Sequence, residues 1–423
     1  MTFDTTTLPL LLEAISKLEA GFPLPTLKQS DDHARMQAIL SDTAQRLHEN
    51  YPYHHPLYLG QMLKPPHPMA RLAYSLAMYL NPNNHALDGG RASSIMEKEA
   101  VAQIAHMFGW KTHLGHLTSG GTFANLEALW VSRESHSGKA VVASAQSHYT
   151  HSRISAVLGI PFRKIAADAL GRMDVAALEI ELKKGDVGTV VVTLGTTAAG
   201  TVDPLPAILA LQKKYPFRIH IDSAYGGYFT LADNLDAPAR AAYDALNQVD
   251  SLVIDPHKHG LQPYGCGCVL FRDPSVGKFY QHDSPYTYFT SDEMHLGEIS
   301  LECSRPGASA VALWATMKLL PLERGGTFAK SLEDCRKARS PSKPTCEPRN
   351  TSCRSSTPNS ISSSGPFALP PPANRAAVPA TSSISPPNTI SISHWLASHD
   401  PWSRSAEPSR RGMRIRSLVC DHA

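Results

Sequence analysis

Four polar side chains of different chemistry each stand just after an apolar, β-branched run of this sequence. They are Lys258, Asp222, His148 and Thr197. A lysine amine can form a Schiff base with a carbonyl, a carboxylate can pair with a protonated ring nitrogen, and an imidazole can stack on a flat ring. Each has a simpler reading when taken alone; for Lys258 this is a surface lysine in a hairpin loop. Together they indicate one bound cofactor.

A fifth group is the segment GHLTSGGT at residues 115–122, which opens a helix predicted over 123–133. Unsatisfied backbone N–H groups and the helix dipole favour an anion at such a position, so Ser119, Gly120 and Thr122 could hold a phosphate. An ordinary capped helix start is the alternative. The spacings typical of P-loops and of nicotinamide-binding turns are not found in this sequence, which disfavours ATP, GTP and nicotinamide cofactors.

From Leu114 onward the pattern alternates between strand and helix, as in a doubly wound sheet. The predicted strands cover 140–143, the neighbourhood of 165, 189–194, 217–221, 252–254 and 268–271, and the predicted helices cover 123–133, 156–160, 175–184 and 207–214. Ligands bind at the carboxyl ends of strands in such sheets, where the polar groups above would meet. A buried carboxylate there needs a positive partner, so we expect one near Asp222.

Pyridoxal 5'-phosphate matches this set of groups one by one. Its aldehyde suits the amine of Lys258, its pyridine nitrogen suits Asp222, and its flat ring suits the imidazole of His148. Its phosphate suits the glycine-rich helix start. The combination is far more specific than any one of these elements.

The sequence resembles the group II pyridoxal-phosphate-dependent amino-acid decarboxylases from about Pro56 to Leu320. The similar motifs are GQM at 60–62, TSGGTFANLEAL at 118–129, SHYTHSRISAVLG at 147–159, TLGTTAAGTVDPL at 193–205, HIDSAYGG at 220–227 and DPHKHG at 255–260. The resemblance implies an α/β fold of the aspartate aminotransferase type (pyridoxal-phosphate fold type I), with a mostly parallel sheet in the large domain and an incomplete small carboxy-terminal domain. It also implies a homodimer that decarboxylates an L-amino acid to the amine and carbon dioxide.

The same resemblance implies roles for individual residues. Lys258 would carry the Schiff base, His148 would stack on the ring, Asp222 would pair with the pyridinium nitrogen, Ala224 would pack beneath the ring, Thr197 would contact its hydroxyl side, His257 would contact the cofactor, and Ser119, Gly120 and Thr122 would hold the phosphate. Members of the family often have asparagine at the position of Asp255, and an acid there would be repelled by the phosphate unless it were hydrogen-bonded or protonated.

Two further residues are expected to act on the substrate. Arg305, in ECSRPGASAVALW at 302–314, would clamp the substrate carboxylate, and the alternative is a helix-capping arginine. Tyr288, or Tyr286 in the same segment HDSPYTYFTSDE, would protonate the Cα carbon, and the alternative is a pair of packed or exposed tyrosines.

Other functions remain open at this point. One is another pyridoxal chemistry, either a carbon–carbon lyase of the sphingosine phosphate lyase kind or a cysteine desulfurase. A desulfurase needs a reactive cysteine, whereas Cys266 and Cys268 belong to a strand pattern and Cys303 is the remaining candidate. A different class is a truncated protein that binds the cofactor without turning over a substrate.

Composition limits the partners. The 423 residues carry a net charge of +3, but residues 335–423 hold ten Arg and two Lys against four acidic residues, or +8, which leaves about −5 on the rest. A mildly acidic body indicates no nucleic-acid partner, and no apolar run reaches the roughly 18 residues of a membrane span. We expect a cytoplasmic protein with a small-molecule amino-acid substrate and no metal.

The predicted organisation has four parts. These are a helical segment at 1–55, a cofactor-binding large domain at 56–280, the start of a small carboxy-terminal domain at 281–334, and a tail at 335–423. The first part would dock its apolar helix faces on the main body or on a partner subunit. The tail holds 13 of the 33 prolines, many serines and few acids, which predicts disorder or a change of reading frame near 334–340.

Overall fold

A computed structural model describes residues 5–22, 32–55, 58, 60–62, 64–281 and 294–339. All of them lie in one compact unit, Met1–Pro366. The second unit, Phe367–Ala423, lies outside the described residues, as do Tyr286, Tyr288 and the predicted tail beyond Arg339. No helix in the described part of the chain combines the length and apolar composition needed to cross a bilayer.

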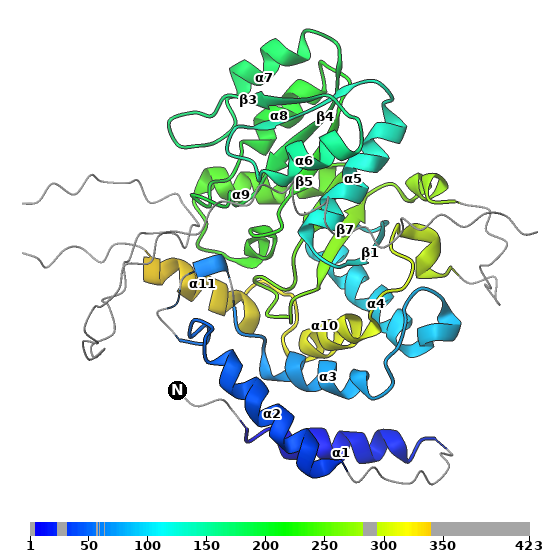
Figure 1. The fold of residues 1–423 in the computed structure, drawn as a ribbon. Helices are drawn as coiled ribbons and strands as arrows, with labels where there is room; N and C mark the ends of the chain where they lie inside the picture. Colours follow the sequence, from blue (N-terminus) through cyan, green and yellow to red (C-terminus); the bar gives the residue numbers. More distant parts are fainter. Residues whose placement is uncertain are drawn as a thin grey trace, which may run out of the picture. The chain divides into compact units, whose positions relative to one another are not determined.

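A seven-stranded sheet forms the centre of the structure (Figure 1). Its strands are β1 (Leu114–Thr118), β2 (Ala140–Ser144), β3 (Phe162–Ile165), β4 (Val187–Thr193), β5 (Arg218–Asp222), β6 (Ser251–Ile254) and β7 (Gly267–Phe271). Their order is β1-β7-β6-β5-β4-β2-β3, and only the pairs that include β7 are antiparallel. Strand β1 therefore runs parallel to β6, and six strands end at the same edge.

Helices cover both faces of this sheet, which is why its strands are apolar on both sides. They include α5 (Gly121–Ser135), α6 (Thr150–Val157), α7 (Val175–Leu182), α8 (Leu205–Gln212) and α9 (Ala237–Asp244). On β4, Val190 and Val192 join the core cluster that contains Ile208 of α8, while Val191 joins the cluster that contains Ile154 of α6. Each fully buried valine stabilises the fold by about 1.5–3 kcal/mol.

Helix α6 differs from its predicted position at 156–160. It begins at Thr150 and ends at Val157, and Ile160 lies beyond it. The Thr150 N–H points to His148 Nδ1 at 3.4 Å and the Thr150 hydroxyl lies 2.8 Å from the same atom, so polar contacts fix the start of the helix earlier than hydrophobic periodicity indicated.

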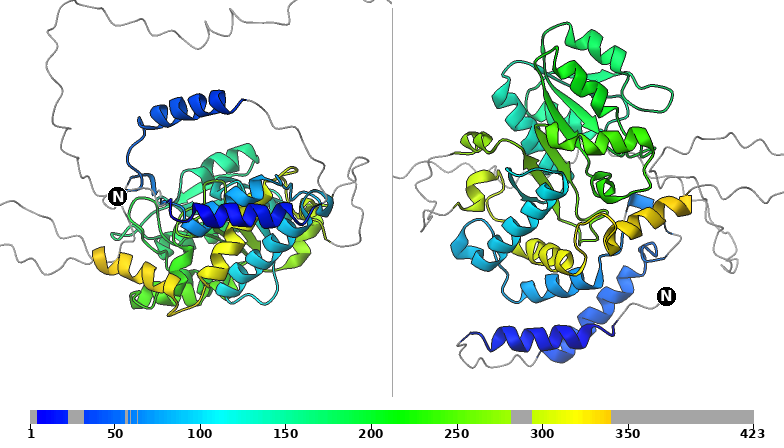
Figure 2. Two further views of the ribbon diagram at one scale, coloured as in Figure 1. Left: turned by 90° about the horizontal axis from the view of Figure 1, so that it is seen from below. Right: turned by 180° about the vertical axis from the view of Figure 1, so that it is seen from behind.

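The last described helices belong to the main core. Helix α10 (Gly307–Leu319) packs against α3 (Pro68–Met78) and α4 (Leu87–Met107), and α11 (Thr327–Arg339) continues the chain past Asp334. Leu313 of α10 lies in the same cluster as Ile104 of α4 and Leu252 of β6. Figure 2 shows α10 beside α3 from a second direction.

Short 3-10 helices connect these elements: η1 (Gly60–Met62), η2 (Gly227–Leu231), η3 (Leu246–Gln248), η4 (Pro274–Phe279) and η5 (Leu296–Ile299). The amino-terminal helices α1 (Leu8–Glu19) and α2 (His33–Leu47) contain no buried residue. Their large apolar side chains are exposed, including Leu12 at 64% and Leu40 at 66%. Helix α1 contacts α3.

Candidate active site

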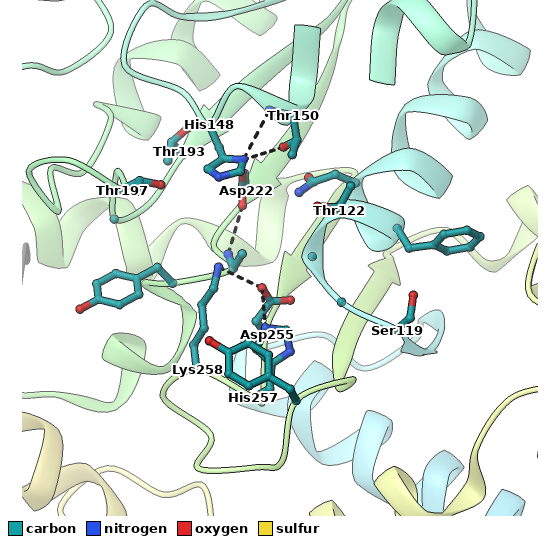
Figure 3. Close-up of a pocket in the computed structure, with 18 residues that line it drawn as sticks. Ser119, Thr122, His148, Thr150, Thr193, Thr197, Asp222, Asp255, His257 and Lys258 are labelled. Carbon is teal, nitrogen blue, oxygen red and sulfur yellow. Dashed lines mark hydrogen bonds and ion pairs between the residues drawn. The ribbon is translucent and has the colours of Figure 1, made fainter. Parts of the chain in front are cut away.

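A cavity of about 480 Å³ opens where five parallel strands end (Figure 3). Its wall includes all nine residues that were predicted to bind the cofactor. They are Ser119, Gly120, Thr122, His148, Thr197, Asp222, Ala224, His257 and Lys258. In the sequence these residues extend from Ser119 to Lys258. They meet because the carboxyl ends of β1, β2, β4, β5 and β6 share one edge of the sheet.

Lys258 reaches into this cavity from the loop after β6. Its Nζ lies 3.0 Å from Asp255 Oδ2, and its side chain is 22% exposed. Burial alone would lower the pKa of Lys258, but the negative charges of Asp255 and Asp222 outweigh burial and raise it. The amine is therefore held as ammonium, and it must lose a proton before it can attack a carbonyl.

Asp222 ends β5 and is buried. Its Oδ2 accepts a hydrogen bond from His151 Nε2 at 2.8 Å, and its Oδ1 accepts one from the Ala224 N–H at 3.2 Å. Burial alone would raise the pKa of Asp222, but the hydrogen bond and charge of His151 and the charge of Lys258 bring it below the usual value. The positive charge expected near Asp222 is that of Lys258, whose direct ion pair is with Asp255, and His151 adds a hydrogen-bond donor that was not predicted from the sequence.

His148 follows β2 and is held by Thr150, which stands two residues later. Because the Thr150 N–H can only donate, His148 Nδ1 acts as the acceptor in this contact. Burial lowers the pKa of His148, the nearby Asp222 opposes this, and Lys258 adds to it. A neutral imidazole held in a fixed plane can stack on an electron-poor ring.

The glycine-rich turn connects β1 to the start of α5. Gly120 has a φ of 156°, in a region that other residues rarely adopt, and Gly267 packs so closely on it that a Cβ there would lie 2.6 Å from the Gly120 carbonyl carbon. The Ser119 N–H donates to Glu302 Oε2 at 3.2 Å. The start of the 15-residue α5 lines the cavity, which places the positive end of its helix dipole at the predicted phosphate position.

Asp255 lies beside the start of α5. A Cβ at Gly121, the first residue of α5, would lie 2.6 Å from Asp255 Oδ2 and 2.9 Å from its Oδ1. His257 is fixed by its Nδ1–H, which donates to the Cys266 carbonyl at 2.8 Å, and by the ring of Tyr264, whose centroid is 4.8 Å away. The DPHK segment is therefore held in place on both sides of Pro256.

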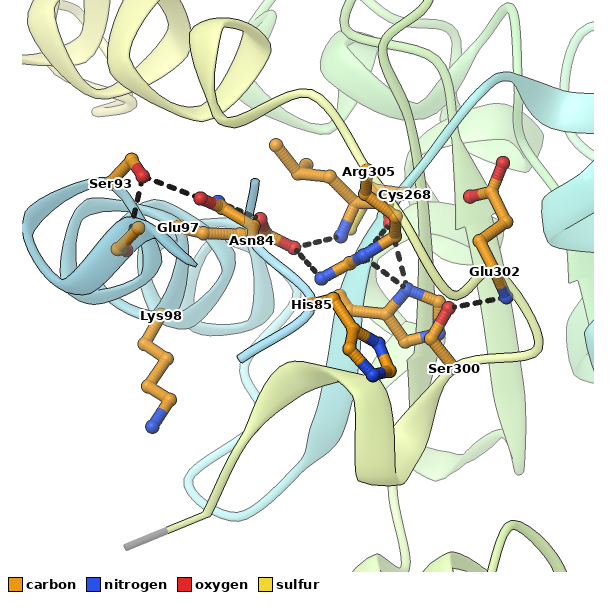
Figure 4. Close-up of polar contacts among 12 residues, drawn as sticks. Asn84, His85, Ser93, Glu97, Lys98, Cys268, Ser300, Glu302 and Arg305 are labelled. Carbon is orange, nitrogen blue, oxygen red and sulfur yellow. Dashed lines mark hydrogen bonds and ion pairs between the residues drawn. The ribbon is translucent and has the colours of Figure 1, made fainter. Parts of the chain in front are cut away.

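Arg305 does not line the cavity, contrary to what its predicted role as a substrate clamp requires. It is buried, and its Nη2 lies 3.1 Å from Glu97 Oε1 (Figure 4). Its Nη1 donates to the Leu117 carbonyl, while the Leu117 N–H donates to Glu97 Oε1 at 2.9 Å. Arg305 and Glu97 thus hold the backbone carbonyl and N–H of Leu117, just before the glycine-rich turn. Neither predicted role of Arg305, as a substrate clamp or as a helix cap, included this contact.

A buried polar network continues from Arg305. Its Nη1 lies 3.2 Å from His116 Nδ1, and His116 Nε2 lies 2.9 Å from Glu127 Oε2. His116 Nδ1 also lies 2.8 Å from the Leu117 carbonyl, which accepts from Arg305 Nη1 as well. The Tyr280 hydroxyl donates to the same Glu127 oxygen at 2.9 Å. The network links the strand that leads to the glycine-rich turn with α5, which follows that turn.

Several residues of the cavity wall had not been assigned a role from sequence. They are Gly121, Phe123, Asn125, Thr150, Thr193, Gly195, Tyr225 and Tyr264. Asn125 could have been found from its position one turn into α5, where it accepts from His220 Nε2 at 2.8 Å. His151 could have been found because it stands three residues after His148 in the same motif, in the first turn of α6.

The free cysteines bear on the alternative function of a cysteine desulfurase. Cys266 and Cys268 are buried, and burial raises the pKa of both thiols. A thiol with a raised pKa is a poor nucleophile at neutral pH. Cys303 is exposed and is not part of the described cavity wall. Within the described residues, no group of three or more His, Cys, Asp or Glu side chains is placed to hold a metal ion.

The donor set of the cavity fits pyridoxal phosphate. Besides the amine, the carboxylate and the imidazole, the wall contains buried polar atoms that have no hydrogen-bond partner among the described residues, namely Thr193 Oγ1 and Asp255 Oδ1. A cavity of this size holds a cofactor together with a small substrate.

The sequence was compared with models of known protein families. Residues 22–326 match the family described as the pyridoxal-dependent decarboxylase conserved domain. The chain belongs to this family. Its cofactor is pyridoxal 5'-phosphate, and the predicted family membership and cofactor are confirmed.

Relatives in the family are named as amino-acid decarboxylases. An L-tyrosine decarboxylase of Enterococcus faecium is 27% identical, and the match covers 71% of this chain and 66% of that enzyme. A probable L-aspartate decarboxylase of Halobacterium salinarum is 33% identical, and the match covers 62% of this chain and 70% of the relative. The chain thus spans about two thirds of the length of these curated relatives.

Solved structures of similar fold include mouse CSAD, with a TM-score of 0.66 and 20% identity over 79% of this chain and 78% of that one. Another is a rice TDC with bound pyridoxal phosphate and tryptamine, with a TM-score of 0.59 and 17% identity over 80% of each chain. At these identities the likeness concerns the fold. The predicted fold type I with a mostly parallel sheet is confirmed.

Proposed function

We propose that this protein decarboxylates an L-amino acid to the amine and carbon dioxide with pyridoxal phosphate. The observation that carries the proposal is the single cavity in which Lys258, Asp222, His148 and the glycine-rich helix start meet. Family membership and the names of the tyrosine and aspartate decarboxylase relatives support it. The bound cofactor supplies a ring that withdraws the electron pair left at Cα when carbon dioxide departs.

The side chains of this protein prepare that chemistry. Lys258 would bind the cofactor and release it to the substrate amine, for which the ammonium must first give up its proton. Asp222, with its lowered pKa, stays ionised and would keep the ring nitrogen of the cofactor protonated. His148, oriented by Thr150, would stack on the cofactor ring.

The charge of the cavity wall also suits loss of a carboxylate. Among the described wall residues there is one lysine, Lys258, and no arginine. A substrate carboxylate without a cationic partner is poorly stabilised away from water, and its departure as neutral carbon dioxide relieves that unfavourable burial. The role of Arg305 as a substrate clamp stays a prediction, and the contact of Arg305 with Glu97 argues against it.

A product assay tests the proposal. The purified protein, loaded with pyridoxal phosphate, is given tyrosine, aspartate, glutamate and other amino acids, and carbon dioxide and amine are measured. We expect carbon dioxide from at least one of them, and none from Lys258→Ala. Aldehyde release would indicate a carbon–carbon lyase, and sulfide release from cysteine a desulfurase. Binding of the cofactor without any product would indicate a protein that only binds it.

A homodimer is also proposed, and the exposed apolar side chains of α1 and α2 support it. Leu8, Leu12, Ile39 and Leu40 are between 49% and 66% exposed, more than apolar side chains of a stable helix pair usually are. A second copy of the chain would cover them. Sedimentation velocity of the wild type and of Leu12→Ser with Leu40→Ser tests this, and a wild-type monomer would contradict it.

A further inference from the structure

Asp255 has an unusual position for an acid. It is 2% exposed and joins β6 to Lys258. Its Oδ2 lies 3.0 Å from Lys258 Nζ, while its Oδ1 is buried and has no hydrogen-bond partner among the described residues. Both oxygens lie against Gly121, where α5 begins. The helix start that would hold the cofactor phosphate is therefore already beside a carboxylate.

Among the described residues, one cation faces this carboxylate. Lys258 contacts it, and Lys258 also lies within the field of Asp222, so two carboxylates share one ammonium. His257 Nε2 lies 3.6 Å from Asp255 Oδ2, but burial lowers the pKa of His257, as it does that of His148. Both imidazoles are therefore neutral near pH 7.

The other titratable groups near Asp255 are neutral as well. Burial raises the pKa of Tyr228, which lies in η2, and the pKa of Cys266 and Cys268, which flank the start of β7. None of them can offset a negative charge. Glu302, on the segment that precedes α10, adds a further carboxylate at Ser119, but it is partly exposed to solvent.

We propose that Asp255 takes up a proton from solvent when the cofactor phosphate binds at the start of α5, so that a neutral carboxylic acid stands beside the phosphate. The inference rests on the proposed function. A phosphate carries about 1.5 to 2 negative charges near pH 7, and Asp255 cannot turn toward water because it is buried. Protonation removes the repulsion and gives Oδ1 a hydrogen to donate.

The test uses pyridoxine 5'-phosphate, which has no aldehyde and therefore leaves the amine of Lys258 unreacted. Calorimetry in buffers of different ionisation enthalpy counts the protons bound with the ligand. We expect the wild type to take up about one proton more than Asp255→Asn, and its affinity relative to that variant to fall about tenfold per pH unit from pH 7 to 9. Glu302→Gln is the matched control and should bind protons as the wild type does.

Infrared difference spectra identify the proton carrier. A carboxylic C=O band should appear when pyridoxine 5'-phosphate is added to the wild type and to Glu302→Gln, and it should be missing in Asp255→Asn. Binding to the wild type without this band would overturn the proposal even if the variant failed to fold. Failure of the wild type to bind either this ligand or pyridoxal phosphate would instead overturn the proposed function on which the inference rests.

Discussion

Replacing Arg305 by methionine tests whether this residue is a structural ion-pair partner or a substrate clamp. Its side chain is 5% exposed and that of Glu97 is 2% exposed, so the substitution leaves a buried carboxylate without its cation. Two neutral donors remain on Glu97, Asn84 Nδ2 at 2.6 Å and the Leu117 N–H at 2.9 Å. Breaking a buried pair in this way typically destabilises a protein by about 3–5 kcal/mol. With the two donors retained, we expect about 3 kcal/mol for Arg305→Met.

The measurement is urea unfolding followed by circular dichroism, with and without the cofactor. Glu97→Gln and the double variant Arg305→Met with Glu97→Gln complete a double-mutant cycle. Because the double variant leaves no buried charge unpaired, it should recover about 2 kcal/mol relative to the sum of the single changes. Since the pair holds both polar groups of Leu117, cofactor affinity should also fall in each single variant.

The clamp prediction gives the opposite pattern. Arg305→Met would then leave the free energy of unfolding within about 0.5 kcal/mol of the wild type, as for an ordinary surface change. The KM for the amino acid would rise about a hundredfold with cofactor affinity unchanged, which corresponds to a loss of about 2.7 kcal/mol of binding. That result would show that Arg305 leaves Glu97 to meet substrate, and it would refute a structural role for the ion pair.

Three further predictions concern the site and its support. Lys258→Ala should abolish the visible absorbance of covalently bound cofactor, and persistence of that band would remove Lys258 from the site. His151→Leu removes the hydrogen-bond donor of Asp222 and should destabilise the protein by about 1.5–3 kcal/mol in urea unfolding at pH 7; unchanged stability would contradict the role given to this contact. Burial lowers the pKa of His220 and His259 to about 3, so the unfolded chain binds protons first as pH falls. Stability should therefore be full above about pH 6.5 and fall below it, by on the order of 4 kcal/mol between pH 7 and 5 for the two together, and a flat profile in that window would exclude them.

The residues that line the cavity could be predicted from the sequence because their positions depend on local pattern. A polar residue directly after an apolar strand lies at the carboxyl edge of a parallel sheet whatever the details of packing. Asp222 is the last residue of β5, His148 and Lys258 each follow their strand by four residues, and the sheet order brings β2, β5 and β6 to one edge. The strand ends matched the pattern because β-branched runs buried on both faces are hard to mistake for loops.

The contacts between distant segments could not be predicted in the same way. Glu97 and Arg305 are 208 positions apart, and nothing in the neighbourhood of either residue indicates the other. Arginine near a predicted site has two readings, a substrate clamp or a structural ion pair, and only the packing of α10 on α4 decides between them. The packing of α10 in the main core is likewise a long-range outcome, which periodicity within residues 307–319 does not encode.

The two carboxylates of the site have different partners, and this difference suits their different tasks. Asp222 receives a hydrogen bond from His151, whose other ring nitrogen is buried with no partner among the described residues. This contact gives Asp222 a hydrogen bond that favours its ionised form. The negative charge of Asp222 then stays available for a ring nitrogen. Asp255 is in direct contact with the ammonium of Lys258, the group that would bind the cofactor. The acid that must keep its charge is thus supported by a buried hydrogen-bond donor, and the acid beside the predicted phosphate position is paired with the amine that would bind the cofactor.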